Sequence, residues 1–184
     1  MNRSCFATYV AVLISGFVFT GCGKDSPSTK KTVADDELKS DARSVADAYE
    51  TNLLEAFVSK EIQNGGKCFI DSFNGQIVRP NNEVGRSGLL TIDGWAIDAS
   101  SAAAKKLAVE LAAVDGSKKY YAPAQGAVRP GLGKALGNPA LDDAALQSTA
   151  SLSNVSPGQY SVRLIVGDDK AVSRCDPNIL LVVN

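Results

Sequence analysis

The stretch YSVRLIV, residues 160–166, has the alternating pattern of a half-buried β-strand. Its larger apolar side chains recur at every second position, which places them at Tyr160, Val162, Leu164 and Val166. Because successive side chains of a strand point to opposite faces of the sheet, these four share one face. The stretch therefore predicts a strand that contributes one face to a hydrophobic core.

Further segments downstream of residue 67 repeat this pattern. Residues 107–113 and 179–183 alternate in the same way, whereas residues 89–97 are apolar on both faces, as a central strand would be. Turn signals such as Asn74-Gly75 and Pro157-Gly158 separate the segments. Several short strands with frequent turns predict a mainly β fold, an antiparallel β-sandwich over residues 67–184.

A different period precedes these strands. Between residues 34 and 64, apolar side chains recur every three or four positions, as at Leu38, Val45, Tyr49 and Leu53. The glycines that follow Asn64 are typical of a helix C-terminus. The pattern predicts one long amphipathic α-helix over residues 34–64, which packs on the sandwich or on another chain.

The N-terminus has the features of an export signal. Arg3 is followed by 15 mainly apolar residues, 5–19, which are fewer than the roughly 20 needed to span a membrane. The run leads into Phe19-Thr20-Gly21-Cys22, where small residues precede a cysteine. This stretch resembles the lipobox of bacterial lipoproteins, although Phe19 stands where the family usually has leucine.

The lipobox resemblance implies a location and a membrane partner. It implies that residues 1–21 are removed as a signal peptide and that Cys22 carries lipid, so that the protein is anchored in the cell envelope. Because Gly23, and not aspartate, follows the cysteine, the family rule favours the outer membrane in a Gram-negative cell, facing the periplasm or the surface. The polar residues 22–33 then form a flexible tether. The alternative is an ordinary signal peptide with an incidental cysteine.

The remaining cysteines suggest a disulfide. Cys5 falls within the signal and Cys22 within the lipobox, which leaves Cys68 and Cys175 in an exported domain. A bridge between them would close a loop of about 100 residues and contribute on the order of 4–5 kcal/mol in the loop-entropy model. The alternative is a pair of buried thiols.

Composition narrows the functional classes. The net charge is −1, so no broad basic field is expected to hold nucleic acid. The chain has no histidine, which is the commonest general base and metal ligand, and no metal site or cofactor is expected. We therefore expect a protein that is not an enzyme. The competing hypothesis is an enzyme that uses carboxylates such as Asp93 or Asp98, which requires two acids that face one cleft.

Three segments together resemble a module of bacterial envelope proteins. They are GWAID at 94–98, VRPGLGKALGNPAL at 128–141 and LSNVSPGQYSVRLIV at 152–166. The module carries a G-W-A-x-D strand, an arginine-containing loop that leads into A-L-G-N-P, and an L-x-x-G-x-Y strand. The resemblance covers roughly residues 67–184 and implies an immunoglobulin-like fold with no settled activity. Gly131-Leu132 departs from the module's usual loop, where an acidic residue follows the arginine.

We consider three residues as possible binding residues. Tyr120 and Tyr121 are adjacent on an expected strand, so one of them should face outward, where it could stack on a sugar. Arg129 could hold an anionic ligand or pin the long loop 126–146. These expectations support non-enzymatic binding or scaffolding of a protein or glycan partner, with a carbohydrate- or peptidoglycan-binding module as the alternative.

The lipobox assignment predicts that Cys22→Ala abolishes acylation, because the substitution removes the thiol that would carry the lipid. Metabolic labelling with a fatty-acid analogue should lose its signal, and the variant should leave the membrane fraction. Retention of both the label and the membrane association would show that Cys22 is not the anchor. Cys5→Ala is the matched control and should change neither readout.

Overall fold

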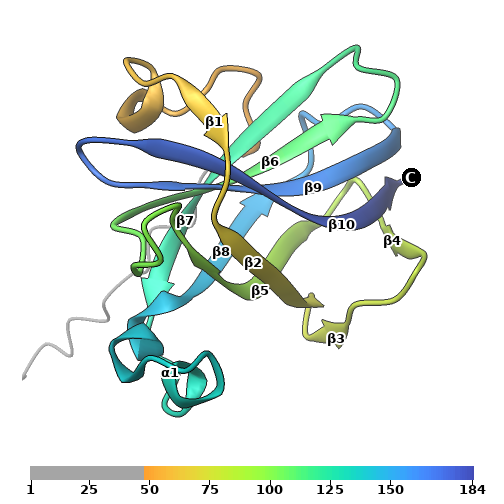
Figure 1. Cartoon of the computed structure of the whole chain (residues 1–184). Helices are drawn as coiled ribbons and strands as arrows, with labels where there is room; N and C mark the ends of the chain where they lie inside the picture. Colours follow the sequence, from red (N-terminus) through yellow and green to blue (C-terminus); the bar gives the residue numbers. More distant parts are fainter. Residues whose placement is uncertain (1–47) are drawn as a thin grey trace, which may run out of the picture. The chain divides into compact units, whose positions relative to one another are not determined.

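Strands dominate the computed structural model, which describes residues 48–184 (Figure 1). The expected signal peptide, tether and residues 34–47 of the expected helix lie outside the described residues. The strands are β1 (Ile62–Asn64), β2 (Lys67–Phe73), β3 (Gln76–Ile77), β4 (Asn82–Val84), β5 (Leu89–Ile97), β6 (Lys106–Ala113), β7 (Lys119–Ala127), β8 (Ala145–Ser151), β9 (Gly158–Gly167) and β10 (Val172–Val183). The helical elements are one short α-helix, α1 (Leu132–Ala135), and two 3₁₀ turns, η1 (Glu55–Phe57) and η2 (Pro139–Ala144). None of the helices within residues 48–184 is long and apolar enough to cross a membrane.

The strands pair along one open path, in the order β1-β10-β9-β6-β7-β8-β5-β2-β3. The segments expected at 89–97 and 160–166 form β5 and most of β9. Neighbouring long strands pair antiparallel, but β1 and β4 both pair parallel with β10. The expectation of a purely antiparallel sheet is therefore wrong, because the two short strands β1 and β4 run parallel to β10 along its outer edge.

The path folds back on itself at β7, and the core lies inside this fold. Residues 119–124 of β7 pair with β6, and residues 125–127 pair with β8. In Figure 1 the half with β6, β9 and β10 crosses the half with β2, β5 and β8. Val109 and Leu164 from the first half pack in one buried cluster with Ile70 and Ile92 from the second. Burial of each such side chain contributes about 1.5–3 kcal/mol.

A disulfide joins the two halves near their free edges. Cys68 in β2 is bonded to Cys175 in β10, with 6.1 Å between the Cα atoms, as the sequence predicted. The two cysteines are 107 positions apart, so the bond closes a loop that contains most of the domain. In the loop-entropy model, opening this loop would cost about 4–5 kcal/mol.

The long strand β10 is interrupted immediately after the disulfide. Its pairing with β9 shifts register between Cys175 and Ile179. Pro177 has no N–H group to donate to a ladder, and Asn178 adopts a left-handed φ of 60°. The Asp176 carboxylate accepts a hydrogen bond from the Asn178 N–H at 2.8 Å, which stabilises the bulge.

Residues 48–62 correct the expectation of a long helix. Within this segment, which we call the strap, the only helical element is the 3₁₀ turn η1. The Tyr49 N–H donates to the Ser151 carbonyl at 3.0 Å, and Glu50 exchanges two backbone hydrogen bonds with Tyr121. The strap thus fills the gap where β7 diverges from β8. Because a helix uses its own carbonyls as acceptors, it could not have supplied these bonds.

The apolar spacing of the strap serves two separate clusters. The ring of Tyr49 is fully buried in the main core. Phe57 packs instead on the outer face of the sheet, against Ala108, Ile165 and Val172. The three- and four-residue spacing of apolar side chains in the strap therefore reflects burial at two different places and not one face of a helix. Both places belong to the β domain, so the strap is part of that domain.

The packing of the strap predicts that Phe57→Ala destabilises the full-length protein by about 3–5 kcal/mol, because it empties a buried site. Val58→Ala is the matched control, since the Val58 side chain is exposed and the same backbone is retained. Urea unfolding, followed by the fluorescence of the single tryptophan, measures both effects. Equal free energies of unfolding for the two variants would mean that the strap is not packed on the sheet.

Candidate functional site

The two candidate tyrosines are buried, so the expectation that one faces outward is wrong. The Tyr120 ring lies in the main core, where its hydroxyl is 3.1 Å from the Ser156 Oγ. Tyr121 points to the opposite face, but the strap pairs with its backbone and it is only 7% exposed. Burial and the nearby Glu110 carboxylate raise the pKa of Tyr121 to about 12. Neither ring is available for stacking on a sugar.

Arg129 pins the long loop, which was one of its two expected roles. Its guanidinium donates to the Asp71 carboxylate of β2 at 2.6 Å, and its N–H donates to the Asp142 carbonyl at 2.7 Å. The loop is ordered further by Asn138, whose side chain accepts from the Ala140 N–H and caps η2. Arg129 and the two tyrosines have no partner in common, so the structure does not combine them into one site.

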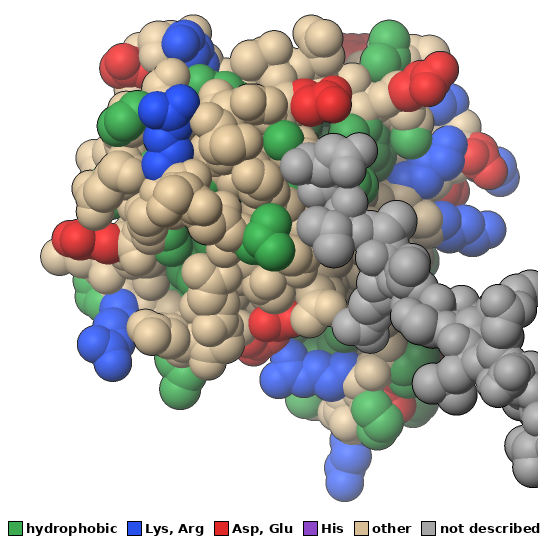
Figure 2. All heavy atoms as spheres, turned by 180° about the vertical axis from the view of Figure 1, so that it is seen from behind, with side chains coloured by type: hydrophobic (Ala, Val, Ile, Leu, Met, Phe, Trp, Pro, Cys, Tyr) green, Lys and Arg blue, Asp and Glu red, His purple; other side chains and the backbone are tan. Residues whose placement is uncertain are grey.

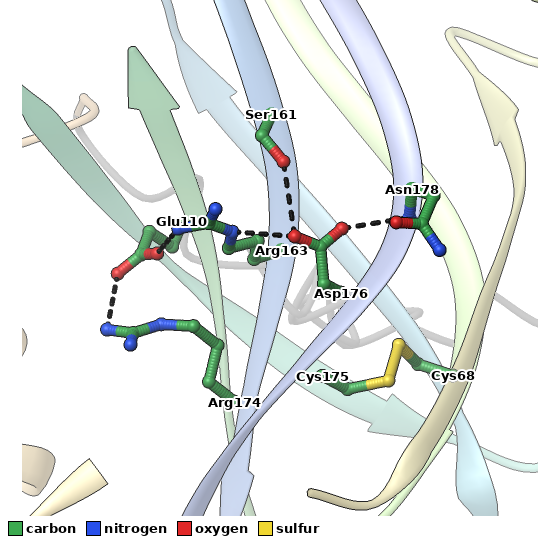
Figure 3. Close-up of polar contacts among 8 residues, drawn as sticks. All are labelled: Cys68, Glu110, Ser161, Arg163, Arg174, Cys175, Asp176 and Asn178. Atoms are coloured by element: carbon green, nitrogen blue, oxygen red, sulfur yellow. Dashed lines mark hydrogen bonds and ion pairs between the residues drawn. A yellow bond between two sulfur atoms is a disulfide. The ribbon is translucent and has the colours of Figure 1, made fainter. Parts of the chain in front are cut away.

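A buried carboxylate that the sequence analysis did not single out organises the outer face of β6, β9 and β10. Glu110 has no exposed surface. Figure 3 shows Arg163 and Arg174 reaching it from β9 and β10. The Arg174 Nη2 lies 3.0 Å from one carboxylate oxygen, and the Arg163 Nη1 lies 3.4 Å from the other. A single glutamate within the apolar stretch VELAA was the available sequence signal.

A second carboxylate orients one of these arginines. The Nε of Arg163 donates to Asp176 at 2.9 Å, and the Ser161 hydroxyl lies 3.4 Å from the same oxygen. Asp176 is positioned by the bulge of β10, beside the disulfide cysteine Cys175 (Figure 3). The strand register thus aligns two arginines and two acids, which could not be recognised before the strands were paired.

These side chains line an open hollow, which we call the arginine cleft. Its volume is about 490 Å³, and it is lined by Asn64, Gly65, Gly66, Arg163, Arg174, Cys175 and Asp176. Glu110 and the partly exposed Asp176 together balance the two guanidinium charges, but each arginine keeps N–H donors that these carboxylates do not occupy. Arginine presents five N–H donors in a fixed planar arrangement, which suits carboxylate and phosphate groups. The cleft can therefore bind an anionic group.

A second hollow, the bulge cleft, lies on the outer face of the other half. It has a volume of about 410 Å³, and Asp71, Asp93, Arg129 and Gln147 are among its lining residues. Asp93 accepts from Gln147 at 2.7 Å and from Ser72 at 2.8 Å. Every polar group named here has a partner within the protein.

The two carboxylates proposed for an enzyme are not brought together. Asp98 lies near a different hollow and accepts backbone hydrogen bonds from Ser100 and Ala102, both at 2.9 Å. Asp93 instead shares the bulge cleft with Asp71. Among residues 48–184, no group of three or more histidine, cysteine, aspartate or glutamate side chains could hold a metal ion.

Trp95 does not lie in the main core. It is half-buried on the outer face of β5, against a small cluster that includes Leu132 and Leu141 from the long loop. Figure 2 shows basic and acidic side chains interspersed over the face that it displays. No protein-family model, curated protein or solved structure matches this chain.

The buried network predicts strong coupling between Glu110 and Arg174. Arg174→Met should destabilise the full-length protein by about 3 kcal/mol, because it leaves a buried carboxylate with one poorly aligned partner. The double variant with Glu110→Leu should recover most of this loss, as measured by urea unfolding. Lys119→Met, which replaces an exposed cation on a neighbouring strand, is the control. Additive losses in the double variant would show that the two residues do not interact.

Proposed function

We propose that the chain is a lipid-anchored protein of the cell envelope whose β domain binds a partner without catalysing a reaction. The arginine cleft is the observation that carries the binding proposal. Its charged groups are fixed by a buried carboxylate and by strand pairing, so they are ordered before any ligand arrives. A pre-ordered site loses less entropy on binding, and it suits recognition of an anionic group on a partner.

We further propose that the domain is an immunoglobulin-like sandwich. If the seven long strands β2 and β5–β10 are lettered A to G, the neighbours A-B-E-D and C-F-G are those of an immunoglobulin domain. Tyr160 near the start of β9 adds support, since its hydroxyl donates to the Ser156 carbonyl at 2.6 Å, as in a tyrosine corner. The disulfide differs from the usual one, because it joins A to G and not B to F.

The anchor proposal rests on the lipobox resemblance and on the disulfide. Structural disulfides persist mainly in exported proteins, so the Cys68–Cys175 bond fits a domain outside the reducing cytoplasm. Cys22 lies 26 positions before the first described residue. At about 3.3–3.6 Å per extended residue, the segment between them can span at most about 90 Å. A tethered domain of this kind can reach partners near the membrane surface.

The arginine cleft predicts a site-specific cross-link in cells. A photoreactive amino acid at Asn64, which is exposed on the rim of the cleft, should form an adduct with the partner. Arg163→Gln in the same chain should reduce the adduct at least roughly tenfold, because it removes a charge-assisted contact. Because Arg163 also pairs with the buried Glu110, both proteins are compared well below the melting temperature of the variant, with the disulfide intact.

Position Ile77 supplies the matched control for this experiment. It is 80% exposed and lies at the opposite end of the strand path, in β3. The same photoreactive amino acid at Ile77 should give no adduct with that partner. An adduct at Asn64 that persists in the Arg163→Gln variant, or that forms equally at Ile77, would contradict binding at the arginine cleft.

A second candidate function is carbohydrate binding at the envelope. The tyrosines do not support it, since both are buried. The bulge cleft does support it, because a half-exposed aromatic residue, Phe69, lies on the same strand face as the paired polar groups. A sugar offers both an apolar C–H face and hydroxyl groups, so it can use the two kinds of surface together.

A further inference from the structure

We infer that a neutral saccharide binds across the outer faces of β2, β5 and β8, with Phe69 under its apolar face and the bulge cleft under its hydroxyl groups. This inference rests on the second candidate function and assigns it a site. The site is separate from the arginine cleft, which lies on the other half of the folded sheet. The sequence had singled out two of its residues, Arg129 as a possible binding residue and Asp93 as a possible catalytic carboxylate.

A bulge in β2 creates the arrangement. The pairing of β2 with β5 shifts register between Ile70 and Ser72, so Asp71 has no partner residue of its own. Ile70 and Phe73 remain in the core, and Asp71 and Ser72 lie between them with hydrogen-bond partners on the outer side. Bulges often redirect side chains in this way beside functional sites. Two neighbouring polar side chains are thereby available on the same face.

Gly94 allows the bulge to form. A Cβ atom at this position would lie 2.3 Å from the carbonyl oxygen of Phe69, which is far inside van der Waals contact. Only glycine therefore lets β5 approach β2 closely enough at the bulge. The register shift itself lies on the facing strand β2, between Ile70 and Ser72.

The polar groups of the bulge cleft are fixed in orientation. Asp93 is held from both sides by Gln147 and Ser72, and Asp71 is held by Arg129. A carboxylate has about four acceptor positions and a side-chain amide has two donors, so each group keeps capacity for a further hydrogen bond. The neighbouring hydroxyl groups of a sugar both donate and accept hydrogen bonds. They can therefore bond to the carboxylate acceptors and the amide donors of this cleft, which lie close together.

An apolar platform lies next to these polar groups. Phe69 is 51% exposed and is two residues from Asp71, which places both side chains on the outer face of β2 about 7 Å apart. Trp95 is directly opposite Phe69 in the register of β5 and is itself half-buried. The cleft volume of about 410 Å³ is within the usual range for small-molecule sites.

The charges of the site favour a neutral ligand. Asp71, Asp93 and Arg129 sum to −1, so a phosphate or carboxylate would meet two carboxylates and only one cation, which is already paired. Hydroxyl groups carry no such penalty, because they bond to carboxylates as donors and to arginine as acceptors. The hydrogen-bonding groups of this surface can thus be used by the hydroxyl groups of a saccharide, whereas its carboxylates would repel an anion.

The single tryptophan provides a local readout for the test. The full-length protein is titrated with the tetrasaccharides of β-1,4-linked N-acetylglucosamine and of β-1,4-linked glucose, and Trp95 emission is followed. We expect a saturable change with at least one of them. Phe69→Ala and Asp93→Asn should each weaken binding at least roughly tenfold, while the near-ultraviolet circular dichroism and the melting temperature stay close to those of the wild type.

Leu89→Ala is the matched control for Phe69→Ala. Leu89 is also 51% exposed and lies on the same face of β5 as Trp95, but it is six positions away, or about 20 Å. The Leu89→Ala variant should bind saccharide as the wild type does. Binding that leaves Trp95 emission unchanged, or that survives Phe69→Ala, would overturn this site and leave carbohydrate binding in place. Absence of binding to either probe, measured also by calorimetry, would overturn both.

Discussion

The bond between Cys68 and Cys175 is the constraint on which the rest of the domain depends. The strand path is open, and β2 and β10 lie near its two ends. The disulfide brings these strands together, and their inner faces share one core with the strands between them. An open sheet of this length would otherwise expose long unpaired edges, which are prone to associate. Short strands, β1 and β4 beside β10 and β3 beside β2, shield parts of these edges.

The closure of the sheet also explains why the strap is needed. The fold at β7 leaves a gap where this strand diverges from β8, and the outer face of β6, β9 and β10 is partly apolar. The strap covers both places, with Tyr49 in the gap and Phe57 on the outer face. Its cover extends to Tyr121, which adjoins the buried Glu110. A charged group inside the protein is tolerated only when partners surround it, and here two arginines do so.

The two clefts follow from irregularities in otherwise regular strands. The bulge of β10 positions Asp176 against Arg163, and the bulge of β2 exposes Asp71 to Arg129. Each bulge lies in one of the two disulfide-bonded strands, β2 or β10, within a few residues of the bonded cysteine. Regular pairing would have presented evenly alternating side chains, whereas the bulges bring charged groups together. The proposed functions therefore depend on the places where the ladder is interrupted.

Local patterns in the sequence were sufficient for several elements. The strands at 89–97 and 160–166 and the turn at Asn74-Gly75 follow from side-chain periodicity and from backbone preferences of single residues. The disulfide followed from counting cysteines in a chain that was expected to be exported. The pinning role of Arg129 was one of two open alternatives, and its partner Asp71 could not be named until β2 was paired.

The sequence by itself determined the strands at 89–97, 107–113, 160–166 and 179–183, because the alternation of side chains is a property of neighbouring residues. Tertiary structure alone decided the rest. The apolar residues of the strap have helical spacing, but they pack in a gap and on an apolar face that exist only after the sheet has folded. Tyr121 is buried because the strap covers it, and Glu110 finds its two arginines because strand register aligns residues 53 and 64 positions away. These contacts join distant parts of the chain, and no local pattern encodes them.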